Sequence, residues 1–222
     1  LATTTAQFQT FLEGYAALDR KPVFMVGFNR RFSPAILRLQ EELSGRSAPM
    51  MVNYRLNGGR IPTGSWIQGV EGGGRNVGEA CHMYDVFRSL TGAPAVDVRA
   101  LPIASRPADT LANDNFVATI RYEDGSVCTL TYTAIGPKQG MPKERIEVFC
   151  DGRGWVVDDY VRLTAAGTDA PLWEGAVDKG HAEEIRRFGE SIRHGGASPI
   201  AAEEIIETTA VSLAIEEMLR SG

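Results

Sequence analysis

The segment from residue 95 to residue 165 constrains the fold most, because short β-rich runs alternate there with turn residues. The runs are AVDVRALPI, NDNFVATIRY, SVCTLTYTAI, ERIEVFC, GWVVDD and YVRLTA, and RYEDGSV between two of them is typical of a hairpin. Apolar residues take every second position, as Phe116, Ala118 and Ile120 do. The pattern predicts antiparallel strands with one apolar and one more polar face.

Helical patterns flank these strands. Helices are expected from Thr5, from Ser33–Pro34 to the SG at residues 44–45, over 76–91 with a stop at Gly92, over 179–194, and through Ile205 and Leu219. VFMVGF at 23–28 and PMMVNYRLNG at 49–58 read as two further strands. The sequence therefore predicts an α+β domain whose mostly antiparallel open sheet carries helices mainly on one face.

Composition and charge exclude several classes of protein. The 222-residue chain is 43% hydrophobic and has a formal net charge of −5, which argues against a nucleic-acid surface. No apolar run approaches the roughly 20 residues needed to span a bilayer. The cysteines, three in number, have no metal-binding spacing and are expected to be reduced. We expect a cytoplasmic protein with no nucleic-acid, membrane or metal partner.

A glycine-rich segment leads into the residues best suited to chemistry. Positions 58–74 hold seven glycines and should form a long surface loop that ends in GGG. On the helix that follows, Glu79, His82 and Asp85 are spaced three residues apart. A histidine can exchange a proton with a hydroxyl or carbonyl group, and a nearby carboxylate can orient it. The alternative is a surface histidine with two solvated acids.

Two more candidates lie in GFNRRF, at residues 27–32. Asn29 and Arg30 follow an apolar run, where loops commonly hold ligands, so either could contact a hydroxylated or anionic substrate. Surface ion pairs of the arginines are the alternative interpretation. The GGG segment leaves backbone N–H groups open to a polar ligand, but it lacks the G-x-G-x-x-G of a dinucleotide-binding turn.

Two motifs, VGFNRRFSPAI and GGGRNVGEACHMYDVFRSLTG, resemble the C-terminal part of glucose-fructose oxidoreductase and inositol dehydrogenase type enzymes, the Gfo/Idh/MocA family. The resemblance implies a C-terminal domain like that of dihydrodipicolinate reductase, here at residues 31–222. Residues 1–30 would be the last helix and strand of a Rossmann domain that is otherwise missing. The intact protein would use NAD or NADP, whereas this fragment would lack the catalytic lysine, bind no cofactor and be inactive alone.

The resemblance also assigns roles to individual residues. His82 matches the family histidine that assists proton transfer at the substrate hydroxyl, in a G-G-G…D-x-G-x-H pattern. Gly78 stands where the family often has Asp, and whether Glu79 replaces that acid stays open. Arg30 matches a substrate-side arginine, and Asn57 lies where members place another polar contact. Asn29, Asp85 and the loop residue Trp66 complete the candidates for substrate contact.

The main hypothesis is the substrate-binding and oligomerisation domain of an NAD(P)-dependent oxidoreductase for a sugar, sugar derivative or cyclitol. Its rival is a non-catalytic binding or assembly module on the same scaffold, which Gly78 favours. A homo-oligomer is expected through the sheet face that carries Val117, Thr119 and Arg121, because that face is only moderately polar.

Overall fold

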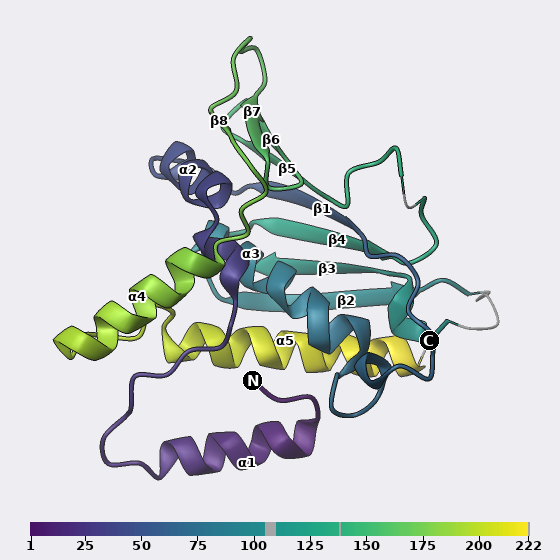
Figure 1. Cartoon of the computed structure of the whole chain (residues 1–222), viewed down its shortest axis with the longest axis vertical. Coiled ribbons are helices and arrows are strands. Elements are labelled where there is room, and N and C mark those ends of the chain that lie inside the picture. Colours follow the sequence, from purple (N-terminus) through teal and green to yellow (C-terminus); the bar gives the residue numbers. More distant parts are fainter. Residues whose placement is uncertain (105–109, 138, 222) are drawn as a thin grey trace.

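The computed structural model describes residues 1–104, 110–137 and 139–221, and it has the expected α+β architecture. Eight strands form one open sheet in the order β2-β3-β4-β1-β5-β6-β7-β8 (Figure 1). At its centre, β1 (Met51–Asn57) runs parallel to β4 (Val127–Thr133) and antiparallel to β5 (Glu144–Cys150). Every other strand pair is antiparallel, which confirms the mostly antiparallel open sheet.

The remaining strands extend the sheet on both sides of this centre. They are β2 (Ala95–Pro102), β3 (Phe116–Tyr122), β6 (Arg153–Asp158), β7 (Arg162–Ala165) and β8 (Trp173–Glu174). The sequence pattern predicted each of them except β8, which has only two residues and too little length for a period-2 pattern.

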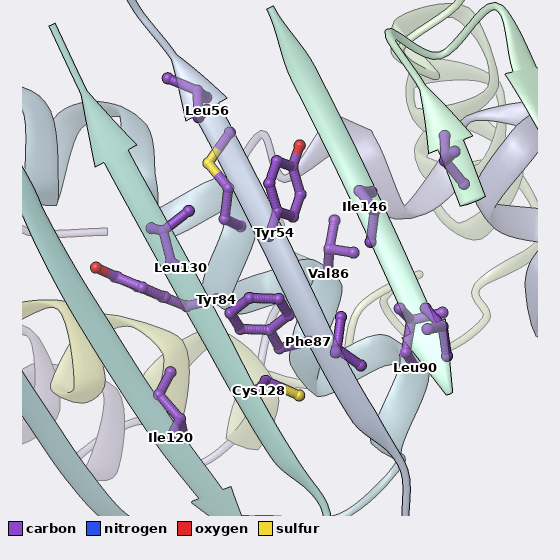
Figure 2. Packing of buried hydrophobic residues seen from close by; sticks show 14 of the residues in the cluster. Tyr54, Leu56, Tyr84, Val86, Phe87, Leu90, Ile120, Cys128, Leu130 and Ile146 are labelled. Atoms are coloured by element: carbon purple, nitrogen blue, oxygen red, sulfur yellow. The ribbon is translucent and has the colours of Figure 1, made fainter. Parts of the chain in front are cut away.

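The alternation along the strands separates a core face from an open face. Along β3, Phe116, Ala118 and Ile120 are buried, whereas Val117 and Arg121 are exposed. Figure 2 shows side chains of β1, β4 and β5 meeting those of a helix in the core: Tyr54, Leu56, Leu130 and Ile146 face Tyr84, Phe87 and Leu90. Burial of apolar area at about 25 cal/mol per Å² makes this cluster the main stabilising element.

The helix in this core is α3 (Cys81–Thr91), which lies beside α5 (Ala202–Ser221) on the same face of the sheet (Figure 1). Gly92 ends α3 in the left-handed conformation with φ 68°, as the sequence indicated. Ser33 caps α2 (Pro34–Leu43) through a bond from the Ile36 amide, with proline in the first turn. These helices bury their apolar stripes on the strands, as predicted.

The first thirty residues differ from the sequence interpretation in two respects. Helix α1 (Thr5–Ala16) is present, capped by Thr4 rather than Thr5, but it buries no residue and lies apart from the sheet (Figure 1). The expected strand at 23–28 is wrong, because the segment is extended without pairing to a neighbouring strand. Its backbone N–H groups find other partners: Phe24 donates to the Ser198 hydroxyl at 3.1 Å, and Phe28 donates to the Val26 carbonyl oxygen at 2.7 Å. The boundary between residues 1–30 and 31–222 stays a prediction.

Helix α4 (His181–His194) forms where it was expected, yet its apolar stripe is not covered by the sheet. Ile185 and Ile192 are 65% and 59% exposed. None of the helices in the described chain is long and apolar enough to cross a membrane. Within the same residues, all cysteines are free.

Candidate functional site

The parallel pairing of β1 and β4 brings polar residues from distant parts of the chain to one edge of the sheet. Both strands end there, and β5 begins at the same edge, so Leu56 is registered with both Tyr132 and Glu144. The segment Asn76–Ala80 is π-helical and continues into α3, which places Glu79 and His82 over this edge. Single π-helical turns occur frequently at functional sites.

Glu79 is the centre of a charged cluster at this edge. Its Oε2 accepts hydrogen bonds from the Tyr132 hydroxyl at 2.5 Å and from Arg75 at 2.9 Å, and the Lys143 ammonium lies 3.3 Å from Oε1. Burial acts to raise the pKa of Glu79, but Tyr132, Lys143 and Arg75 outweigh it and lower the pKa below the ordinary value. Glu79 is therefore an ionised, fully paired carboxylate at neutral pH.

His82 lies next to this cluster with its imidazole unengaged. Its side chain makes no hydrogen bond to the described residues, and its Nδ1 atom is buried without a partner. The ring meets Phe28 edge to face, with the ring centroids 5.8 Å apart. Burial, followed by the positive charge of Arg30, lowers the pKa of His82 to about 4. The imidazole is neutral at physiological pH and can accept or donate a proton.

Arg30 lies close enough to His82 to affect its pKa, but its guanidinium group is engaged inside the protein. It forms a two-pronged ion pair with Glu144, at 2.9 Å and 3.1 Å, and Lys179 and the Tyr54 hydroxyl contact the same carboxylate. Arg30 is 7% exposed and Glu144 1%. Burial opposes ionisation of Glu144, but Arg30 and Lys179 lower its pKa to about 2. Arg30 is thus held inside the protein by Glu144, and its contact with substrate stays a prediction.

Three other predicted residues are not brought to the cluster. Asp85 is fully buried and receives two hydrogen bonds from Arg31, at 2.7 Å and 2.9 Å. Asn29 is 3% exposed and donates to the Lys179 carbonyl oxygen at 2.8 Å. Trp66 is 70% exposed on the glycine-rich loop. Asp85 follows His82 by three residues, but it follows Glu79 by six residues of helix, and this rotation turns it away from the cluster towards Arg31.

Asn57 opens onto a cavity of about 320 Å³ beside Glu79. Lys143, Gly58 and Gly59 also line this cavity, and Arg75 joins it to Glu79 by donating to the Gly58 carbonyl oxygen at 3.0 Å. Asn57 donates to the Pro137 carbonyl oxygen at 2.6 Å, while its Oδ1 atom is buried without a partner. The cavity thus offers an acceptor and a cation to a polar ligand.

The glycines before α3 allow backbone segments to approach each other closely. A Cβ atom on Gly72 would overlap the Ile67 backbone, and one on Gly78 would overlap the Gly72 carbonyl oxygen. The position where family members often carry Asp is therefore filled by the loop itself. Glu79 points instead to Tyr132 and Lys143, so it occupies a different place from an acid at position 78.

Tyr132, Lys143 and Glu144 were missed as functional residues by the sequence interpretation. Tyr132 has the inward position of an alternating strand, and Lys143-Glu144 begins another strand, so each looks structural by itself. Only the pairing of β1 with β4 and β5 brings Tyr132 and Lys143 to Glu79 and brings Glu144 to the same edge of the sheet, where it pairs with Arg30. Among the described residues, no group of three or more His, Cys, Asp and Glu side chains could hold a metal ion.

The sequence profile of the GFO/IDH/MocA C-terminal domain matches residues 46–156, half of the 222-residue chain. The structure agrees with this match: it has an open sheet, and helix α3, which carries His82, lies against it. The chain belongs to the Gfo/Idh/MocA family.

Two solved structures illustrate the shared fold. UDP-N-acetylglucosamine 3-dehydrogenase from Acidithiobacillus ferrooxidans superposes with a TM-score of 0.76 at 20% identity, over 99% of this chain and 68% of that one. Levoglucosan dehydrogenase in complex with NADH and levoglucosan gives 0.75 at 20% identity, over 99% and 70% of the two chains. A comparison with curated protein sequences gave no match.

Proposed function

We propose that this domain is the substrate side of an NAD(P)-dependent dehydrogenase acting on a hydroxyl or carbonyl group of a sugar, sugar derivative or cyclitol. The observation that carries the proposal is His82: a neutral imidazole with an unengaged Nδ1, beside an ionised Glu79 at the edge of the sheet. Two sugar-related dehydrogenases share the fold. Three free thiols agree with the reducing cytoplasm that we propose as its location.

In this proposal His82 handles the proton of the reacting hydroxyl group. When an alcohol is oxidised, the neutral imidazole accepts that proton, and it returns the proton when a carbonyl is reduced. The negative charge of Glu79 favours the imidazolium that forms, while burial and, after it, the charge of Arg30 lower the pKa of His82 and keep the resting imidazole neutral. Glu79 holds Lys143 at the Asn57 cavity, where hydroxyl groups of a substrate find both donors and acceptors.

The described residues do not fit a dinucleotide. They contain no strand–turn–helix unit with a glycine fingerprint, and no residue of this chain is assigned to the cofactor. NAD(P) is proposed for the intact protein because levoglucosan dehydrogenase, with the same fold, binds NADH. Hydride transfer would be the chemistry of that cofactor.

A non-catalytic binding or assembly module is the second candidate. The internal ion pairs of Arg30 and Asp85 and the glycine at position 78 favour it, because they leave fewer side chains for a substrate than the family pattern suggests. His82 distinguishes the two candidates, since a binding module has no use for a proton acceptor.

Substitution of His82 in the intact protein tests the proposal. His82→Ala should lower kcat by about 10²- to 10⁴-fold and change KM much less, because general acid–base assistance acts in the transition state. Steady-state kinetics with a sugar or cyclitol substrate measures this. His194→Ala, at the exposed end of α4, is the control and should retain full turnover. A His82 variant within a few-fold of the parent enzyme would favour the binding module.

A further inference from the structure

A second cavity lies at the glycine-rich turn, apart from the cavity at Asn57. It has a volume of about 350 Å³ and shares no lining residue with the Asn57 cavity. Its wall is formed by the N-terminal residues Thr3 and Thr4, the turn at Gly73–Gly74, the segment Leu111–Asn113, Gln68 and the last turns of α5. Pockets for small ligands occupy roughly 300–1,000 Å³, so this cavity has room for one small molecule.

Two amide side chains in its wall carry acceptors that nothing satisfies. Asn113 is 7% exposed and donates through Nδ2 to Glu216 at 3.1 Å, which fixes its orientation and leaves Oδ1 without a partner among the described residues. Gln68 donates through Nε2 to Asp114 at 2.8 Å, and its buried Oε1 is likewise without a partner. A buried acceptor left unpaired costs about 1–3 kcal/mol, so a bound molecule that donates to either atom would be stabilised there.

The charge in this cavity is balanced. Glu216, 8% exposed, accepts hydrogen bonds from Asn76 at 3.0 Å and from Arg220 at 3.2 Å, in addition to Asn113. One acid and one base thus neutralise each other in the wall, and the remaining requirement is for hydrogen-bond donors. A neutral ligand with hydroxyl groups meets this requirement better than an anion or a cation does.

The turn that forms the cavity has glycines where side chains would intrude. Gly74 has φ +68°, and a Cβ atom there would overlap the Asn113 amide. Gly73 and Gly74 both line the cavity, together with Val70, Leu111 and Ala112. A carbohydrate has hydroxyl groups that can donate to the two amide acceptors. It also has C–H groups that can pack on the small apolar side chains beside them.

We propose that this cavity, with Gln68 and Asn113 as acceptors, binds a neutral hydroxyl-rich small molecule of the polyol or sugar class. The site is separate from the Glu79–His82 cluster and does not depend on the function proposed for that cluster. A molecule bound in this cavity would contact α5 and the glycine-rich turn. Helix α5 in turn packs against the π-helical start of α3.

Titration of the isotopically labelled chain with myo-inositol tests the site by NMR. Saturable shifts are expected in the amide signals of Gly73 and Gly74 and in the side-chain NH₂ signals of Gln68 and Asn113. Inorganic phosphate at equal concentration should cause none, because the wall has no net charge to attract an anion. Shifts confined to Asn57 and His82 would overturn this inference while supporting the proposed function.

A substitution with a matched control makes the test specific. Gln68→Met keeps the length of the side chain, removes its acceptor and should weaken binding of myo-inositol about tenfold. Gln40→Met removes a comparable amide on α2, which donates only to the Ser89 carbonyl oxygen at 3.4 Å, and should leave binding unchanged. Equal binding by both variants, or no saturable shift at the glycines, would mean that the cavity holds only water.

Discussion

Arg30 and Arg31 are adjacent in the chain, yet their guanidinium groups pair with acids on opposite sides of the short helical turn that carries them. Arg30 pairs with Glu144 at the start of β5, and Arg31 pairs with Asp85 on α3 and with Glu204 on α5. Burial raises the pKa of Asp85 to about 6, against the opposing effect of Arg31. Both arginines therefore fix the elements around His82.

Loss of the Glu144 charge should destabilise the fold. Glu144→Gln leaves Arg30 and Lys179 without their shared counter-charge, and breaking a buried pair in this way costs about 3–5 kcal/mol. Urea denaturation at pH 7 measures the change. Glu183→Gln on the surface of α4, where the acid meets Arg186 and Arg187, is the control and should change stability little.

The same pair predicts a pH dependence. The folded-state pKa of Glu144 lies at about 2, below its ordinary value of 4.5, so its ionised form stabilises the folded state fully above pH 4.5. This contribution is lost as the pH falls from 4.5 towards 2. The Gln variant should therefore show a shallower loss of stability over this range than the parent, and parallel curves would contradict the assignment.

At the scale of elements, the junction between the glycine-rich loop and α3 depends on backbone contact. The Gly72 carbonyl oxygen occupies the space beside Gly78, within the π-helical segment that orients Glu79. Because two main-chain segments touch there, neither can withdraw as a flexible side chain would. The orientation of the Glu79 cluster thus rests on a glycine that does no chemistry.

Gly78→Ala tests this contact. The new methyl group would overlap the Gly72 carbonyl oxygen, so the variant should lose about 1–3 kcal/mol of stability, as overpacking typically does. Gly189→Ala within α4, where nothing lies within 4 Å of the added atom, should instead be neutral or stabilising by up to about 1 kcal/mol. Thermal unfolding of both variants checks the expectation, and equal effects would show that the loop moves aside freely.

At the scale of the whole molecule, the sheet has one face covered by helices and one face open. Apolar side chains lie on the open face among polar ones: Met51, Val117 and Phe149 are 59%, 43% and 49% exposed. Thr129 and Thr131 lie between them on β4. We propose that this face meets a second copy across a two-fold axis, since such an interface must complement itself.

Light scattering at micromolar concentration checks this proposal. The chain should have the mass of a dimer or a larger assembly, and Val117→Glu, which places like charges across the axis, should reduce it towards the monomer. Ile185→Glu alters an equally exposed apolar residue on α4 and should leave the assembly intact. If the parent chain is folded but monomeric, the open face is not an interface between copies of the chain.

We also expect the chain to bind no dinucleotide by itself. Calorimetric titration of the 222-residue chain with NAD⁺ or NADP⁺ should show no saturable binding at micromolar concentration, because no glycine-rich turn opens a βαβ unit to receive the pyrophosphate. Saturable binding at micromolar concentration would contradict the assignment of the cofactor site to another part of the intact protein.

The features that local sequence determined are those that depend on neighbours in the chain. Period-2 alternation predicted β3 and β4, Ser33-Pro34 predicted the start of α2, and Gly92 predicted the end of α3, because side-chain direction and capping act over a few residues. The two motifs around Arg30 and His82, taken together, were enough to identify the family.

Tertiary structure decided what depends on distant partners. The residues 23–28 are as apolar as a strand, but no strand pairs with them. Arg30 reads as a ligand-binding residue until Glu144, 114 positions away, is placed against it. Glu79 and Tyr132, 53 positions apart, meet only because β1 and β4 are parallel. Which acid pairs with which base depends on the packing of the whole chain, because the partners are distant in sequence. A local sequence pattern therefore does not predict these pairs.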